Sequence, residues 1–426
     1  MEPLKVLIVG GGIAGPSFAS WFARTGAEIT LIERSPQLRT SGQQLDVRAQ
    51  GVPVMKKMGI EAAIRAKTIR EPGTRLIDIQ GQTKALFPVT DNAGMKQSFT
   101  TEYEIMRGDL VAILMGLTEK RKNVKHRFGT TVTSLTQDDE SDPKGKVHVG
   151  FDDGHKDDFD LVVAADGTGS RTRRLMLGPE APDPRHFLGG YIGFFSTLAQ
   201  PHDSKCFTFC HLPGGRYIGT RKDKEEMTRV YMQTAVQSDA LDAAHSSGNL
   251  ADLKTAWANI FSDGKWESER FMTALKTSPE ADDLYSTPRQ EVRLPVGSWS
   301  KGRVVAIGDA AHAQTANGFG TTWGLVGSYV LAGEIATLYK QDPSTAVVKG
   351  VKRYEEVFRP IATAQHGGGN ESREALFMPK TAFGIWMLHS VARAVSFFLP
   401  DGGFGMGRDE SKWQVPEYPA LMETQK

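Results

Sequence analysis

The N-terminal part of the chain changes from a strand pattern to a helical pattern and back. Lys5 to Val9 is a β-branched and aliphatic run, typical of a buried parallel strand. Apolar residues at helical spacing follow from Pro16 to Thr25 and stop at Gly26, a residue type favoured directly after a helix. Glu28 to Ile32 is a second short apolar run. This order predicts a strand–helix–strand unit with parallel strands.

Further elements follow from the same two periodicities. Helices are expected at Val52 to Ile64, Gly108 to Arg121, Leu250 to Phe261 and Thr321 to Tyr339. Strands are expected at Thr74 to Val89 (a pair around Gly81-Gln82), Val124 to Thr136, Val147 to Phe151, Asp160 to Ala164 and Val304 to Ile307. Alternating strands are expected at Tyr191 to Leu198, Cys206 to Leu212, Arg216 to Thr220 and Met227 to Ala235. The alternating block indicates a second domain, with an antiparallel sheet, inserted into the first.

The first predicted turn carries the glycine pattern Gly10-x-Gly12-x-x-Gly15 between a strand and a helix. In that context Gly10 permits a tight turn, Gly12 lets a pyrophosphate approach the backbone, and Gly15 lets helix and strand pack closely. The free amides of the helix N-terminus then face the phosphates. Glu33 ends the second strand, where an acid hydrogen-bonds ribose hydroxyls. A glycine-rich turn without a ligand is the alternative.

Two more predicted strands end in an acid and a glycine. Asp160 to Ala164 leads to Asp166-Gly167, and basic residues follow. Open α/β sheets bind ligands at this edge, although a capped loop is the other interpretation. Val304 to Ile307 leads to Gly308-Asp309, followed by Gly318, Gly320, Thr321 and Thr322 before a long helix. Asp309 is placed to accept hydrogen bonds from a ribityl chain, and the positive helix end to stabilise charge on a reduced flavin.

With these three motifs in this order, residues 4 to 370 resemble the single-component FAD-dependent aromatic monooxygenases, the para-hydroxybenzoate hydroxylase class. Within that class, the chain more closely resembles tetracycline-inactivating monooxygenases and fungal or actinobacterial relatives. Gly42-Gln-Gln-Leu-Asp46-Val-Arg48 resembles their flavin-contacting loop, and Met106-Arg107-Gly108-Asp109-Leu110 their FAD-binding arginine. The resemblance implies that Asp46, Arg107 and Asp309 contact FAD, and that Arg39 takes part in NADPH use. Ile13, Ala14 and Arg34 complete the predicted FAD site.

The resemblance also implies the chemistry and the architecture. NADPH or NADH reduces the flavin, oxygen adds at its C4a carbon, and the resulting hydroperoxide hydroxylates an electron-rich substrate. The expected fold is α/β: a Rossmann-like FAD-binding domain of the GR2 type, an interleaved antiparallel-sheet substrate domain and a C-terminal helical tail. The FAD-binding domain is expected to comprise 1–73, 102–184 and 290–370. The substrate domain comprises a hairpin at 74–101 and the main part at 185–289, and the tail is 371–426.

One departure from the family pattern concerns the segment after the Gly-Asp motif. The family has a proline shortly after that motif, where this chain reads Ala311-His312-Ala-Gln314-Thr315-Ala-Asn317. That proline helps to shape the wall beside the flavin where the substrate reacts. Its absence puts the position of oxygen transfer in doubt.

The substrate is expected between the flavin and the alternating sheet. Tyr191, Phe209, His211, Arg216 and Tyr217 lie on that predicted sheet, and strand alternation lets only some of them face the flavin. His211 is the candidate general base for a phenolic substrate, with Arg216 and Tyr217 as further catalytic candidates. For each of them, an ordinary role in the sheet is the alternative.

Composition excludes several other classes of protein. The 51 Lys and Arg residues against 50 Asp and Glu give a net charge of +1, so there is no electrostatic case for nucleic acid. Cys206 and Cys210 fit reduced core thiols and a cytoplasmic protein, and no metal site is expected. No segment predicts a transmembrane helix. The most apolar stretch, Thr381 to Leu399, fits a packed helix, with a membrane-surface helix as the alternative. Monomer and homodimer both fit.

Three functions therefore compete. The leading hypothesis is oxygenation of a medium-sized aromatic, polyketide-like or alkaloid-like molecule, in secondary metabolism or detoxification. A reductase or dehydrogenase that does not oxygenate is the first alternative, and a flavin-binding protein without turnover is the second. Halogenation is disfavoured because no Trp-x-Trp-x-Ile-Pro motif is present.

Overall fold

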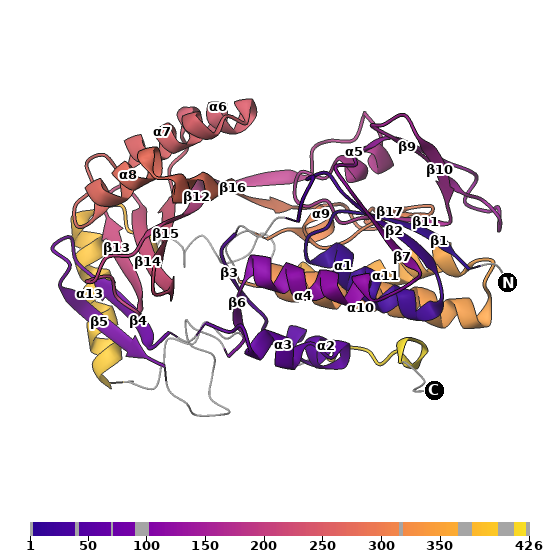
Figure 1. The fold of residues 1–426 in the computed structure, drawn as a ribbon, viewed down its shortest axis with the longest axis horizontal. Helices are drawn as coiled ribbons and strands as arrows, with labels where there is room; N and C mark the ends of the chain where they lie inside the picture. The colour runs from indigo at the N-terminus through magenta and orange to yellow at the C-terminus, as the bar shows by residue number, and fades with distance from the viewer. Residues whose placement is uncertain are drawn as a thin grey trace.

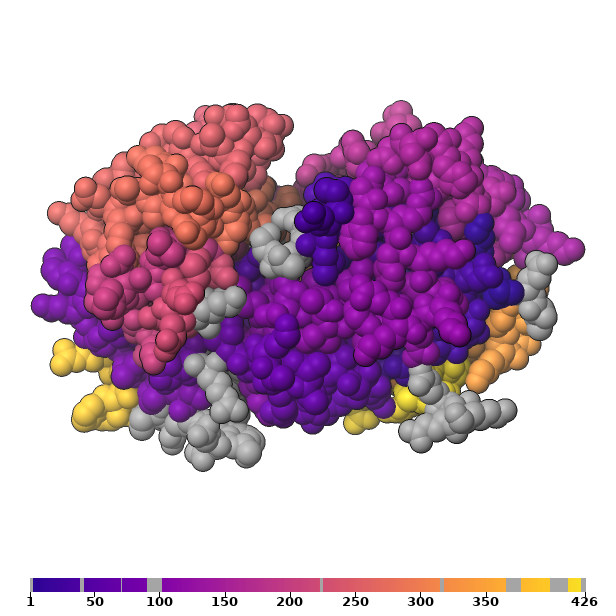
Figure 2. Space-filling model, in the orientation of Figure 1, coloured from indigo at the N-terminus to yellow at the C-terminus, as the bar shows by residue number. Residues whose placement is uncertain are grey.

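The computed structural model describes residues 3–38, 42–69, 71–89, 102–314, 318–364, 377–398 and 413–422. Two halves lie side by side along the long axis of the molecule, each built on its own sheet (Figure 1). Strands β12 (Arg185–Leu198) and β16 (Tyr285–Val292) run from one half towards the other (Figure 1). The surface is hollowed where the halves meet (Figure 2).

The first half is built on a six-stranded sheet with the order β17-β18-β11-β1-β2-β7. The strands are β1 (Lys5–Val9), β2 (Glu28–Glu33), β7 (Val124–Phe128), β11 (Leu161–Ala164), β17 (Ser300–Lys301) and β18 (Val304–Ala306). All neighbours are parallel except the short edge strand β17. The strand–helix–strand prediction and the mixed α/β class are therefore confirmed.

Most helices cover one face of this sheet, while a small second sheet and α5 cover the other. The helices of this half are α1 (Ala14–Phe22), η1 (Ala23–Thr25), α2 (Gly51–Met58), α3 (Glu61–Arg65), α4 (Arg107–Glu119), α5 (Arg171–Leu177), α9 (Asp309–His312), α10 (Gly320–Gln341), α11 (Ala346–Ala362) and η3 (Pro419–Leu421). The small sheet contains β8 (Val132–Gln137), β9 (Val147–Phe151) and β10 (Lys156–Phe159). Alternate residues of β1 point into two separate cores, Val6 and Ile8 into one and Leu7 and Val9 into the other, so the strand is buried on both faces.

The second half is a seven-stranded sheet with the order β16-β12-β15-β14-β13-β4-β5. Besides β12 and β16, its strands are β4 (Gly73–Ile77), β5 (Thr83–Pro88), β13 (Phe207–Leu212), β14 (Arg216–Lys224) and β15 (Met227–Thr234). All neighbours are antiparallel except β4 and β13. The early hairpin thus joins the sheet formed by the later strands, although the exact domain boundaries stay predictions.

This sheet has two different faces. Its back face packs on α6 (Asp239–Ser247), α7 (Leu250–Ile260), α8 (Ser268–Thr277) and η2 (Pro279–Asp283). Its front face carries α13 (Ala382–Phe398) at one edge, where Ala392 packs on Leu76, Ala85 and Phe87. A two-stranded ribbon of β3 (Gln44–Asp46) and β6 (Glu104–Met106) lies in front of the rest.

Two predicted elements are each divided in the structure. The helix expected at Val52 to Ile64 is the pair α2 and α3, because Gly59 takes a left-handed conformation (φ 81°) that ends the first helix. The strand expected at Val124 to Thr136 is β7 and β8, which turn at Gly129 (φ 62°) and enter different sheets. Both cysteines are free thiols.

Candidate active site

The glycine turn between β1 and α1 is as tight as its sequence requires. A Cβ at Gly15 would lie 2.0 Å from the carbonyl oxygen of Gly10, and a Cβ at Gly10 would lie 2.3 Å from that of Ala165. Both positions therefore need glycine for packing. A Cβ at Gly12 would meet only the Arg107 guanidinium, at 3.7 Å, so the space in front of this glycine is open. Ile13 and Ala14 are half-buried beside it at the start of α1.

Glu33 is held beside this turn by two backbone amides. One carboxylate oxygen accepts from the Gly11 amide at 2.8 Å, and the other accepts from the Ser35 amide at 2.9 Å. The carboxylate is therefore fixed at the end of β2 next to the glycine turn, while the neighbouring Arg34 is exposed. Arg39 lies outside the described residues.

Arg107 and Asp309 approach the same open space from two other elements. The Arg107 side chain passes between Gly12 and Gly42, since a Cβ at Gly42 would lie 2.9 Å from its Cδ. Asp309 follows Gly308, which has a φ of 56° and packs on Ala14. Asp309 keeps open surface, yet burial raises the pKa of its carboxyl, against an opposing effect of the Arg107 charge. An acid with both properties lines a deep recess.

We call Gly12, Arg107, Asp309 and Gly320 the cradle. A Cβ at Gly320 would lie 3.9 Å from the Asp309 carboxylate, which places the first residue of α10 at the same recess. Thr321 and Thr322 are buried behind it. The cradle thus combines a guanidinium, a carboxylate and the N-termini of α1 and α10 around an open space. Arginine and helix N-termini suit phosphates, and a carboxylate suits hydroxyl groups.

The predicted flavin loop is fastened to the start of α10. The Thr322 hydroxyl bonds both the amide and the carbonyl of Arg48, each at 3.1 Å. The Arg48 guanidinium pairs with Asp46 and lies 5.4 Å from the centre of the Phe319 ring. Gly318 (φ 74°) lets the chain pass beside that guanidinium. This role of Arg48 was not predicted from the sequence.

Asp166 is used differently from Asp309. Its carboxylate accepts from the Ser170 hydroxyl, and from the amide and hydroxyl of Thr172 at 3.1 and 3.0 Å. These bonds cap the first turn of α5. The capped-loop interpretation describes these contacts, and a direct contact of Asp166 with a cofactor stays a prediction.

The front face of the large sheet carries a continuous row of aromatic rings. Successive rings lie 3.9 to 6.5 Å apart between centroids, in the order Tyr285, Phe194, Tyr231, Phe207, Phe209 and His211, with Tyr217 beside Phe209. We call these seven residues the aromatic face. Strand register explains it, because Tyr231 pairs with Phe194 on one side and with Gly219 on the other.

The pairing of β13 with β14 brings His211 and Tyr217 together on this face, and leaves Arg216 and Tyr191 on the opposite side. Arg216 instead forms an ion pair with Asp263 at 2.6 Å, and the Tyr191 hydroxyl donates to Asp242 at 2.7 Å. The structure does not bring Arg216 to the site, so we remove it from the catalytic candidates. Strand alternation between Arg216 and Tyr217 is the physical reason.

His211 is a buried, neutral imidazole. Burial lowers its pKa to about 4, with a further lowering by His389, and a hydrogen bond with the Phe377 backbone acts in the opposite direction. Its Nδ1 has no hydrogen-bond partner among the described residues. Burial raises the pKa of the Tyr217 hydroxyl to about 12. Near neutral pH, His211 is therefore an acceptor with weak basicity and Tyr217 a protonated donor.

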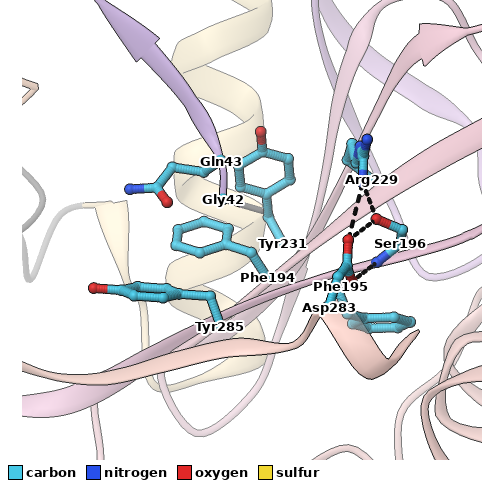
Figure 3. A pocket seen from close by; sticks show the side chains of 9 residues that line it. All are labelled: Gly42, Gln43, Phe194, Phe195, Ser196, Arg229, Tyr231, Asp283 and Tyr285. Atoms are coloured by element: carbon cyan, nitrogen blue, oxygen red, sulfur yellow. Dashed lines mark hydrogen bonds and ion pairs between the residues drawn. The ribbon is translucent and has the colours of Figure 1, made fainter. Parts of the chain in front are cut away.

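A small recess of about 10 Å³ lies where the flavin loop meets the aromatic face (Figure 3). Gly42 and Gln43 form one side, and the rings of Phe194, Tyr231 and Tyr285 form another (Figure 3). The remaining lining residues are Phe195, Ser196, Arg229 and Asp283. Arg229 and Asp283 form an ion pair at 3.0 Å that fixes the floor beside Ser196.

A buried ion cluster connects the ribbon in front of the sheet to the aromatic face. Arg221 pairs with Glu104, lies 3.6 Å from Glu71, and stacks 3.6 Å from the centre of the Phe207 ring. Burial raises the pKa of Glu71, and the Arg221 charge opposes it. The Tyr231 hydroxyl donates to Gln44 at 3.3 Å. These contacts position the loop of Gln44 against the sheet.

The segment after Asp309 that lacks the family's proline is only partly described. His312 is buried and lies 5.0 Å from the Trp299 ring, and the Gln314 amide donates to the Ala362 carbonyl at 2.8 Å. Residues 315–317 lie outside the described residues, so the consequence of the missing proline stays a prediction. No group of three or more metal-ligating side chains occurs in the described ranges.

Comparison with known proteins shows the family of this chain and its cofactor. A family model described as FAD binding domain matches residues 3–178. The flavin-dependent monooxygenase eupH of Phoma sp is 42% identical over 100% of this chain and 97% of its own length. The FAD-dependent monooxygenase asL4 of Sarocladium schorii is 34% identical over 99% of this chain and 100% of its own. The chain belongs to the FAD-dependent monooxygenase family.

The fold of this FAD-dependent monooxygenase has solved counterparts. The crystal structure of tetracycline destructase Tet(51) superposes with a TM-score of 0.70 at 25% identity, over 93% of this chain and 98% of that one. The predicted family, fold class and cofactor are thereby confirmed, and a reduced nicotinamide is the family's co-substrate. The cradle fits FAD, because an acid lines the recess and no side chain fills the space before Gly12.

Proposed function

We propose that this monooxygenase hydroxylates a medium-sized, partly aromatic small molecule lying between the cradle and the aromatic face. The observation that carries the proposal is the recess in Figure 3, where three aromatic rings face the flavin loop. Rings that retain open surface give an aromatic substrate stacking partners and exclude water from one side of it. The relatives from Phoma and Sarocladium and the tetracycline destructase of the same fold support a polycyclic, phenol-bearing substrate.

The chain's own residues would hold the cofactor in a fixed place. The amides around Gly12 and the Arg107 guanidinium would bind the pyrophosphate, Glu33 the ribose hydroxyls, and Asp309 the ribityl hydroxyls. The N-terminus of α10 would favour negative charge on the reduced ring system. The chemistry that FAD supplies when bound is electron transfer from NADPH or NADH to dioxygen, with one oxygen atom going to the substrate.

The front face would orient the substrate rather than ionise it strongly. A pKa of about 4 makes the His211 imidazole a poor general base, and because its Nδ1 is itself buried, His211 would form part of the wall of the site rather than contact the substrate. Tyr217 keeps its proton and would donate to a carbonyl or phenolate oxygen. In this proposal the Tyr217 hydroxyl helps to fix which edge of the ring faces the cofactor. A cytoplasmic location is part of the same proposal.

The experiment is NADPH oxidation by the FAD-loaded protein, in air and without oxygen, with a panel of phenolic and polycyclic compounds. Monooxygenation predicts that one class of compound stimulates oxidation in air and not under nitrogen. Phe194→Ala should weaken that stimulation, while the exposed Phe187→Ala serves as the matched aromatic control. Sustained substrate turnover under nitrogen with another acceptor would instead assign a dehydrogenase or reductase. Bound flavin without any turnover would assign a binding protein.

A further inference from the structure

Helix α13 carries an outward face that is almost wholly apolar. Its inner face is fixed to the sheet by Leu388, His389 and Ala392, which are buried. Its outer side chains at i, i+3, i+4 and further helical positions are large and exposed, between 45% and 78% each: Phe383, Trp386, Met387, Val391, Phe397 and Phe398. Exposed apolar residues elsewhere, such as Val296, are scattered singly, which is ordinary. A contiguous stripe of this size marks an interaction surface.

Two serine hydroxyls of this helix are already hydrogen-bonded within it, so they can enter an apolar environment at little cost. Ser390 lies within the exposed face, and its hydroxyl donates to the Trp386 carbonyl at 2.8 Å. The Ser396 hydroxyl donates to the Arg393 carbonyl at 2.9 Å. Both hydroxyls are thus satisfied inside the helix, so transfer out of water leaves no orphaned donor.

The charged side chains of the segment that contains this stripe are all positive. Residues 377–398 contain Lys380 and Arg393 and no acid, and both cations are exposed. Helical spacing places Arg393 at the edge of the exposed face, where a long side chain can extend towards an anion while its stem covers apolar surface. A second copy of α13 would offer this guanidinium no carboxylate, whereas a phospholipid surface offers phosphates along its whole extent.

We propose that α13 lies on the surface of a phospholipid bilayer, with its aromatic side chains at the level of the headgroups. The helix lies near the end of the molecule opposite both termini (Figure 1), and its outer side chains are exposed. Its aromatic rings and flanking cations are those of helices that rest in the membrane interface. The net charge of +1 gives no long-range attraction, so the apolar stripe carries the binding. No helix in the described part of the chain has the length and apolar character needed to cross a bilayer.

Flotation of the FAD-loaded full chain with vesicles tests this proposal. The vesicles are phosphatidylcholine alone, and phosphatidylcholine mixed with an equal part of phosphatidylserine. We expect the protein to float with both, and the double variant Trp386→Ser/Phe397→Ser to lose at least about tenfold in partitioning. Arg393→Gln should weaken binding about fivefold to the phosphatidylserine vesicles only. Phe187→Ser, an exposed aromatic on β12, is the matched control and should float like the wild type.

Folding of every variant is checked by its flavin spectrum and by NADPH oxidation in solution, because none of these residues lies in the cradle or on the aromatic face. Wild-type protein that stays in solution overturns the proposal, as does a double variant that floats equally well. Light scattering adds a further outcome: a dimer that the double variant converts to a monomer, without flotation, would assign the stripe to a second copy of the chain.

Discussion

The imidazole of His211 on β13 packs edge-on against the imidazole of His389 on α13, with ring centroids 6.0 Å apart. The two residues come from segments far apart in the sequence, and they join the C-terminal helix to the end of the aromatic face. Burial lowers the pKa of each, so both rings are neutral where they meet near neutral pH. Asp78 favours protonation of His389, while Lys84 opposes it. Protonating either ring would bury an imidazolium beside the other ring.

This contact predicts an acid-sensitive fold. Because the folded pKa of His211 is about 4 against about 6.5 in the unfolded chain, the unfolded state binds the extra proton between those values. Stability should therefore fall as the pH is lowered through this window, by on the order of 1–2 kcal/mol for this one residue. Thermal unfolding from neutral pH to about pH 5 measures it, with His211→Gln as the comparison. An equally steep loss in that variant would contradict the assignment.

Alanine substitutions at two glycines of the same turn should have different effects, one on stability and the other on FAD binding. A Cβ at Gly15 would overlap the Gly10 carbonyl, so Gly15→Ala should destabilise the fold by about 1–3 kcal/mol. A Cβ at Gly12 meets nothing closer than 3.7 Å, so Gly12→Ala should fold normally and lose bound FAD. Circular dichroism melts and the ratio of flavin to protein absorbance separate the two effects. Full FAD occupancy in Gly12→Ala would show that the pyrophosphate lies elsewhere.

The positive charge of Arg107 in the cradle should contribute to FAD affinity. Arg107→Ala should weaken FAD binding by about 10- to 100-fold, because a charge-assisted contact with phosphate is lost. Arg127 pairs with Asp153 at the surface of the small sheet, so Arg127→Ala is the matched control and should leave binding unchanged. Titration of the apoprotein with FAD, followed by flavin fluorescence, gives both constants. Equal constants for the two variants would remove Arg107 from the site.

The Asp309 carboxylate should also be needed for FAD binding, because it would accept hydrogen bonds from the ribityl hydroxyls. Asp309→Ala is expected to yield folded protein with little bound flavin, and Asp309→Asn to retain part of the occupancy because an amide still accepts hydrogen bonds. Glu280→Ala, on η2 in the other half of the molecule, provides the control. Normal occupancy in Asp309→Ala would remove the central cofactor assignment.

The aromatic face should act on substrate and not on cofactor. Phe194→Ala removes a ring from the recess beside Gly42, and we expect KM for the stimulating compound to rise about tenfold with unchanged FAD content. Steady-state NADPH oxidation measures the change. A loss of flavin with an unchanged KM would mean that this ring supports the loop rather than the substrate.

The sequence was sufficient where local pattern decides structure. Lys5 to Val9 is a strand as predicted, since its continuous aliphatic run is buried on both faces. The glycine turn and the acids at Glu33 and Asp309 were found from spacing alone, although their contacts with FAD stay predictions. Local pattern failed at Gly129, where a turn inside the predicted strand sends β7 and β8 into different sheets.

Contacts between segments that are distant in the chain could not be predicted from the sequence. Tyr231 and Phe194 were not singled out, because the aromatic face exists only through the register of β12, β15 and β14. Arg216 was placed at the site although the side chains of adjacent residues alternate, which puts it opposite Tyr217. Arg48 and Glu104 likewise acquire their roles from Thr322 and Arg221, which lie far along the chain.

The most direct test of the proposed reaction is to run NADPH oxidation with the stimulating compound under isotopically heavy dioxygen and to measure the mass of the product by mass spectrometry. Monooxygenation consumes one NADPH and one proton per dioxygen, places one oxygen atom in the product and releases the other as water. The proposal therefore predicts a product that carries one heavy oxygen atom for each NADPH consumed, less any uncoupled turnover. A product without heavy oxygen, or hydrogen peroxide formed in the same amount as the NADPH consumed, would contradict it.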